Sequence, residues 1–89
     1  MQYRKRPVVI EAMKYTGLNA SEIIAWAHKG LPAIANSIIV RDVGGLLNVR
    51  TLEGEMMAER TNWIVKGIKG EFYPVREDIF EATYEKVEV

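Results

Sequence analysis

The sequence predicts an α+β fold, in which a small, curled antiparallel β-sheet of about five to six strands carries one helix from the N-terminal half and one short C-terminal helix. Three observations predict it. A run of β-branched residues lies near the N-terminus, apolar residues then recur at helical spacing, and the rest consists of short apolar runs between turn residues. The 89 residues, of which 48% are hydrophobic, suffice for one thin core, so we expect a single domain over residues 1–89.

The first strand is predicted from about Pro7 to Tyr15, where valine and isoleucine are concentrated, and it ends at Thr16-Gly17. The first helix follows. Asn19 is its expected N-cap, with Glu22 three residues later as in a capping box. The predicted apolar face of this helix is Ile23, Trp26 and Ala27, and its predicted stop signals are Gly30 and Pro32.

Residues 34–59 change to short β-type runs separated by turn residues, which predicts a meander of antiparallel hairpins. Two further short runs flank Gly67-Ile68-Lys69-Gly70, a tight connection that places two lysines near one corner. The predicted strands are Ser37–Arg41, Leu46–Leu52, Glu55–Glu59, Trp63–Lys66 and Glu71–Val75, and the first two turns are Val43-Gly44-Gly45 and Glu53-Gly54.

A short second helix is predicted to begin near Glu77 and Asp78, because carboxylates suit the first turn of a helix. The run Lys86–Val89 alternates polar and apolar residues, which predicts an additional edge strand. The helix residues expected to pack on the sheet are Ile79, Phe80, Thr83 and Tyr84.

The charge composition argues against binding partners that are attracted by a large net charge. Lys plus Arg equals Asp plus Glu at 12 each, so the net charge is zero and binding to duplex nucleic acid or to a membrane is not expected. The basic N-terminus is followed by the apolar run Pro7–Ile10, which is too short for a signal peptide or a membrane span. Because the chain has no cysteine, and therefore no disulfide, we expect a cytoplasmic protein.

Residues for catalysis are scarce. His28 is the single histidine and is expected near the end of the first helix, where a cation favours the helix dipole. With no cysteine, we expect neither a metal site nor a nucleophile paired with histidine, and the glycines match no phosphate loop. The carboxylates show no spacing that selects an acid–base pair. We therefore expect a binding protein that needs no cofactor and is not an enzyme.

The segment Trp63–Arg76 interleaves aromatic rings with cations over a short distance. Stacking of a base on an aromatic ring contributes roughly 1 to 3 kcal/mol, and Lys or Arg bonds to phosphate, so the segment suits a nucleotide. The alternative is structural, with Trp63 and Phe72 in the core of a half-buried sheet. The run Tyr3–Arg6 with Lys14-Tyr15 has the same two interpretations. In the structural alternative, the solvated face of the sheet consists of Lys66, Lys69 and Arg76.

Three runs of the sequence carry a family resemblance: Tyr3–Ala12, Asn62–Pro74 and Asp78–Glu85. In this order they resemble a widespread family of small phage and prophage proteins, over both ends and most of the chain. The sequence departs from the family pattern in three places, and the first departure leaves the role of that turn open. Glu59-Arg60-Thr61-Asn62 stands where Pro-Gly-Asp is common, Val75-Arg76-Glu77 where many members have Cys-Lys-Pro, and Tyr15 where they have Trp.

The resemblance implies a phage accessory protein in the cytoplasm of a bacterial host. The protein is similar to the immune-evasion sponges that bind the cyclic dinucleotide signals of CBASS defence and sequester them without cleavage. A homo-oligomer, either a dimer or a tetramer, is then expected, with the ligand at an interface between subunits. The expected binding residues are Tyr15 or Tyr73, stacking on a base, and Lys66, Lys69 or Arg76, near phosphate.

Two other functions stay open. A protein-interaction module would dock on a host or phage enzyme through an exposed strand edge or an aromatic patch. It would form a stable complex with a protein and show no thermal shift with nucleotides. A small nucleotide hydrolase would instead depend on a carboxylate such as Glu11 or Glu71.

Overall fold

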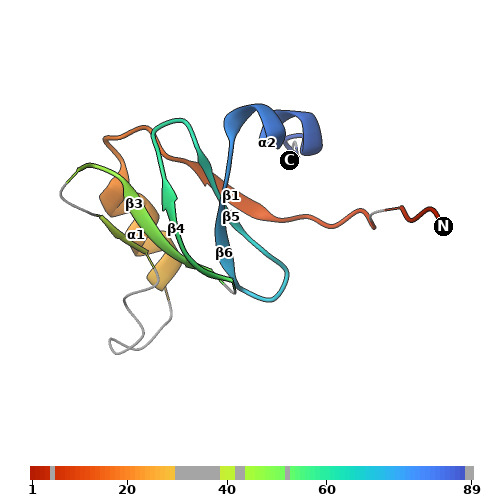
Figure 1. The fold of residues 1–89 in the computed structure, drawn as a ribbon, viewed down its shortest axis with the longest axis horizontal. Helices are drawn as coiled ribbons and strands as arrows, with labels where there is room; N and C mark the ends of the chain where they lie inside the picture. The colour runs from red at the N-terminus through yellow and green to blue at the C-terminus, as the bar shows by residue number, and fades with distance from the viewer. Residues whose placement is uncertain (5, 30–38, 42–43, 52, 88–89) are drawn as a thin grey trace.

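The computed structural model describes residues 1–4, 6–29, 39–41, 44–51 and 53–87 of the chain. Six strands and two helices lie within these ranges, which confirms the α+β class (Figure 1). In chain order they are β1 (Glu11–Lys14), α1 (Ala20–His28), β2 (Ile39–Arg41), β3 (Leu47–Thr51), β4 (Gly54–Ala58), β5 (Trp63–Lys66), β6 (Phe72–Val75) and α2 (Glu77–Thr83).

The strands are divided between two antiparallel three-stranded sheets, in the orders β1-β5-β6 and β2-β3-β4. Strand β6 contacts both β3 and β4, so the two sheets pack against each other across β6. Helix α1 packs beside β2, and an extended arm, described over residues 1–4 and 6–10, leaves the body of the protein before β1 (Figure 1).

One core joins the inner faces of the two sheets to α1. Strand β3 shows the alternation expected of a half-buried strand, since Leu47 and Val49 are fully buried while Asn48 and Arg50 face outward. The predicted face of α1 packs on this core, and the Trp26 ring meets Phe72 edge-on at 5.3 Å. The buried members of the core are Tyr15, Ala20, Ile23, Ala27, Ile39, Leu47, Val49, Ala58, Ile64 and Phe72.

A second, smaller cluster lies on the opposite face of the β1-β5-β6 sheet. The register places Trp63 and Tyr73 on that face, because residues paired across neighbouring strands point the same way. Helix α2 covers them: Phe80 stacks on Trp63 at 4.2 Å, and Tyr84 lies 4.9 Å from Phe80. The predicted packing of Phe80 and Tyr84 is therefore confirmed. Ile79 and Thr83 are exposed instead, since they lie on the solvent side of the helix.

The first strand is shorter than predicted. It begins at Glu11, whose partner Lys66 is the last residue of β5, so the arm residues Pro7–Ile10 extend past the end of the neighbouring strand. These residues have the β-branched composition of a strand, but no strand in the described part of the chain pairs with them.

Asn19 occupies the predicted N-cap position, but its side chain makes no capping bond, so the capping box with Glu22 is absent. Instead its Oδ1 accepts the Thr16 N–H at 2.9 Å, and its Nδ2 donates to the Lys14 carbonyl at 2.8 Å. The helix ends at His28, whose Nε2 accepts the N–H of Ile39 at 3.4 Å, so the histidine joins α1 to β2.

Some predicted features lie outside the described residues: Gly30, Pro32, residues 37–38, Val43, Leu52 and the last two residues. The remaining part of the predicted terminal edge strand, Lys86 and Val87, forms no strand.

Candidate functional site

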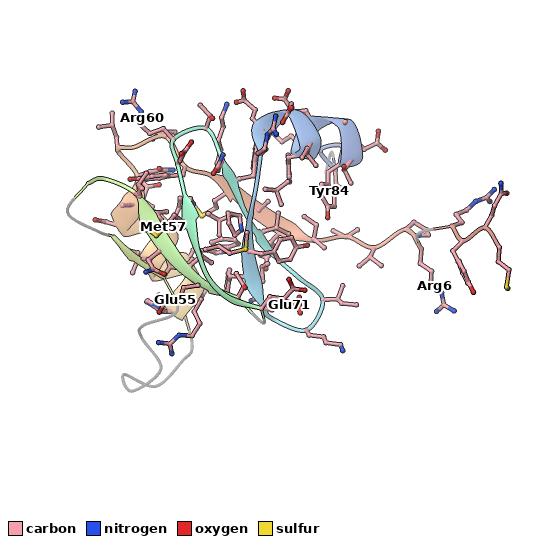
Figure 2. All side chains as sticks on the ribbon, in the orientation of Figure 1. Arg6, Glu55, Met57, Arg60, Glu71 and Tyr84 are labelled. Carbon is pink, nitrogen blue, oxygen red and sulfur yellow. The ribbon has the colours of Figure 1, made fainter. Side chains whose placement is uncertain are left out.

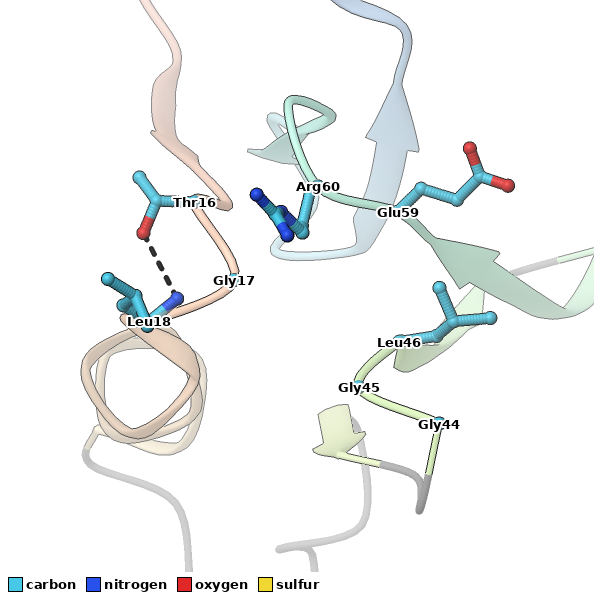
Figure 3. A pocket seen from close by; sticks show the side chains of 8 residues that line it. All are labelled: Thr16, Gly17, Leu18, Gly44, Gly45, Leu46, Glu59 and Arg60. Atoms are coloured by element: carbon cyan, nitrogen blue, oxygen red, sulfur yellow. Dashed lines mark hydrogen bonds between the residues drawn. The ribbon is translucent and has the colours of Figure 1, made fainter.

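A hollow of about 540 Å³ opens between the end of β1 and the turn that precedes β3. The turn between β4 and β5 forms its third wall (Figure 3). Its volume lies within the range of about 300 to 1,000 Å³ that is usual for small-ligand sites. The residues that line it are Thr16, Gly17, Leu18, Gly44, Gly45, Leu46, Glu59 and Arg60.

Three of the eight lining residues are glycines, and two of these have left-handed backbone dihedral angles. Gly17 has φ +91° and Gly45 has φ +84°, a region that side chains with a Cβ rarely adopt. The buried Tyr15 hydroxyl donates to the Gly45 carbonyl at 2.5 Å and so joins two walls of the hollow that are 30 residues apart in sequence. The arrangement leaves backbone groups within reach of a ligand.

Arg60 supplies the positive charge of the hollow. A Cβ atom on Gly17 would lie only 2.9 Å from its Cγ and Cδ atoms, so the arginine stem rests on this glycine. The Arg60 guanidinium has no hydrogen bond or ion pair with any other described residue. The Glu59 carboxylate points away from it in Figure 3. Among the described residues, none compensates the charge of this guanidinium, which suits a phosphate or carboxylate group.

The turn between β4 and β5 is built to present Arg60. The Asn62 side chain accepts the Glu59 N–H at 2.9 Å, and the Asn62 N–H donates to the Glu59 carbonyl at 3.1 Å. Thr61 adopts φ +78° and donates its N–H to the Tyr15 carbonyl at 2.8 Å. This turn stands where the phage proteins that the sequence resembles commonly have Pro-Gly-Asp, and its role could not be predicted from the sequence.

The predicted stacking residue Tyr15 is fully buried, so its ring cannot stack on a base, and that prediction is wrong for the folded chain. It positions Gly45 instead. The other predicted ring, Tyr73, is half-buried beneath α2. Its hydroxyl is hydrogen-bonded with Tyr84 and so belongs to the second cluster, and burial together with this bond raises the pKa of Tyr73 to about 12.

The predicted cations do not form one site with these rings. Lys66 shares the sheet face of Phe72, whereas Tyr73 lies on the opposite face, because neighbours along a strand alternate. The Lys66 Nζ lies 3.9 Å from Glu11 Oε2, and Arg76 bonds to Asp78 at 2.8 Å. Lys69 is exposed in the turn between β5 and β6.

Tyr73 also lines a second hollow of about 390 Å³, together with Thr51, Glu53, Met56, Glu71, Phe72 and Pro74. Two carboxylates and no cation line it, so an anionic ligand is disfavoured there.

The N-terminal aromatic and basic run does not join Lys14 and Tyr15 in a common site. Arg6 lies on the extended arm, apart from both sheets (Figure 2). Lys14 forms an ion pair with Glu77 at the start of α2, and this hydrogen bond raises the pKa of the lysine above its ordinary value of 10.5.

The described residues contain no group of three or more His, Asp or Glu side chains placed to hold a metal ion. None of the helices found in these ranges has the length and apolar character needed to cross a membrane. Comparison with protein-family models finds no match for the chain, and comparisons with curated proteins and with solved structures find none either.

Proposed function

We propose that the protein binds a small phosphate-bearing molecule of the cyclic dinucleotide class and retains it without turnover, as a sponge for a signal in a phage-infected bacterium. The observation that carries this proposal is the Arg60 guanidinium, which stands without a described partner over a hollow surfaced by glycines. The resemblance to small phage proteins supports the same class of function.

In this proposal Arg60 bonds to a phosphate through its planar fork of N–H donors. Gly45 allows the ligand to approach the backbone closely, because no atom lies within 4 Å of the place where a Cβ would stand. Tyr15 keeps the Gly45 wall in place from within the core. The contribution of the protein is therefore shape and charge, and no side chain of the hollow is arranged as a nucleophile with a base.

Isothermal titration with cyclic di-AMP, cyclic di-GMP and cyclic GMP-AMP tests the proposal. We expect at least one of them to bind the wild-type protein and Arg60→Gln to weaken that binding at least about tenfold, as loss of a charge-assisted bond of roughly 1.5 to 3 kcal/mol implies. Arg50→Gln is the matched control, since Arg50 is exposed on β3 outside the hollow and should bind as wild type.

Chromatography of the ligand after prolonged incubation separates a sponge from a hydrolase. We expect the ligand to be recovered intact. Absence of binding to all three ligands, equal losses in the Arg60 and Arg50 variants, or cleavage of the ligand would each overturn the proposal.

A further inference from the structure

The N-terminal arm has the composition of a strand and lacks a partner strand in the described part of the chain. Val8 and Val9 are 47% and 77% exposed, in a run that consists of Pro7, two valines and Ile10. Branched apolar residues of this kind are typical of paired strands. Because β5 ends at Lys66, opposite Glu11, the sheet as described offers this run nothing to pair with.

Strand β1 is an outer strand of its sheet, so one of its edges, the open edge, is paired with no strand in the described part of the chain. The Tyr15 N–H and carbonyl both bond toward β5, to Asn62 and Thr61 at 2.8 Å. Backbone direction alternates along a strand, so the N–H and carbonyl of Lys14 and Ala12 point to the open edge, and those of Ile10 and Val8 continue the series. The Lys14 carbonyl already accepts a hydrogen bond from the Asn19 side chain. The open edge therefore runs from Ala12 toward the arm.

We propose that two copies of this chain pair antiparallel through this edge about a two-fold axis at Ile10, which joins their β1-β5-β6 sheets into one continuous sheet. Ile10 then faces Ile10 of the partner, and Val8 faces Ala12 of the partner. This register uses every outward-pointing backbone group from Val8 to Ala12 and leaves the Lys14 carbonyl with Asn19. Pro7, which has no N–H, falls where the N–H would point away from the partner.

The side chains of the arm fit the same register. Ala12 and Lys14 share the sheet face of Trp63 and Tyr73, which α2 covers, so the alternate arm residues Val8 and Arg6 fall on that face too. Arg6 then arrives opposite Lys14 of the partner, beside the carboxylates that surround this lysine. These are Glu77, which pairs with Lys14, and Glu81, which also acts on its charge.

Charge complementarity supports a second copy as the occupant. Helix α2 has acidic residues in its first turn and no basic residue in its last turn. Arg4 and Arg6 are exposed and make no ion pair with other described residues. Each copy thus offers a basic arm and an acidic helix, and the two-fold axis brings each arm to the helix of the other copy. This inference is independent of the proposed ligand, because the hollow lies past the other end of β1.

Sedimentation equilibrium of the full chain with charge-reversal variants tests the pairing. We expect wild type to form a dimer, and Arg6→Glu and Glu81→Arg each to weaken it at least about tenfold, because two symmetric contacts change from attraction to repulsion. An equimolar mixture of these two variants should form a heterodimer. In it, one arm–helix contact has both charges exchanged and is again attractive, and the other contact has the native charges. Arg50→Glu, on the outer face of β3, is the charge control and should dimerise as wild type.

Proline variants test the backbone register in the same assay. Ile10→Pro removes two N–H donors per dimer at the axis and should weaken dimerisation at least about tenfold. Val9→Pro is its matched control, because the Val9 N–H points away from the partner, and it should remain a dimer. Three results would each overturn the proposal. The first is a wild-type protein that stays monomeric at high concentration, which would mean that the arm pairs with a different protein. The others are a dimer that persists in Ile10→Pro and a mixture of the charge variants that stays monomeric.

Discussion

Tyr15→Phe tests whether the buried hydroxyl holds the wall of the candidate site. The substitution keeps the ring and its packing in the core and removes one hydrogen bond, from the Tyr15 hydroxyl to the Gly45 carbonyl. A hydrogen bond of this kind contributes about 1 to 1.5 kcal/mol, and the carbonyl of the partly exposed Gly45 can recover some of this from water. We therefore expect the free energy of unfolding to fall by about 1 kcal/mol.

The change in melting temperature that corresponds to this loss follows from the length of the chain. Unfolding entropy near the midpoint is about 2.1 cal/mol/K per residue, so the 89 residues give about 0.19 kcal/mol/K and a loss of 1 kcal/mol lowers Tm by about 5 °C. Differential scanning calorimetry measures the shift. Tyr3→Phe is the matched control, because Tyr3 is 87% exposed on the arm and should leave Tm unchanged. Equal midpoints for Tyr15→Phe and Tyr3→Phe would contradict the structural role given to Tyr15.

Three further predictions concern the hollow, the second cluster and Tyr73. Gly17→Ala should destabilise the protein by about 1 to 2 kcal/mol or more, because it strains a left-handed backbone position and displaces the Arg60 stem. Gly70→Ala introduces the backbone strain alone, so urea unfolding of both variants should separate the cost of the strain from the cost of displacing Arg60. Phe80→Ala removes the ring stacked on Trp63, so we expect a loss of roughly 2 to 4 kcal/mol and a red shift of tryptophan fluorescence, while the exposed Ile79→Ala should change little. The pKa of Tyr73 is raised from 10.0 to about 12, so its contribution to stability is complete below pH 10 and is lost as the pH rises through 12; ultraviolet titration of wild type and Tyr73→Phe, with urea unfolding at each pH, should show this difference.

The elements could be predicted where local patterns suffice. Strand β5, Trp63–Lys66, was predicted with its observed bounds, because turn residues flank it and its four residues have strand composition. The first strand was predicted four residues too long at its start, since Pro7–Ile10 has the same composition but lies beyond the end of β5. Composition shows which residues favour a strand, and only the register shows which of them find a partner.

The candidate site could not be predicted, for two physical reasons. Lys66 and Tyr73 lie close together in the sequence and on adjacent strands, but alternation turns their side chains to opposite faces of the sheet. The hollow, in contrast, is assembled by a contact between Tyr15 and Gly45, which are 30 residues apart, and by a turn that places Arg60 over Gly17. The single signal in the sequence was the unusual turn Glu59-Arg60-Thr61-Asn62.

The proposed dimer and the proposed ligand site together fix the binding stoichiometry. Thr16, at the edge of the hollow, lies about six residues beyond the axis at Ile10, and at about 3.3 Å per residue this is about 20 Å of strand. The two hollows of a dimer then lie about 40 Å apart, too far for one cyclic dinucleotide to contact both. Titration should therefore give one ligand per chain, whereas a ligand shared at the two-fold axis, as the family resemblance suggests, would give one ligand per two chains. A ratio of one per two chains would mean that the arm pairing or the location of the site is wrong, and sedimentation of Ile10→Pro with and without ligand would show which.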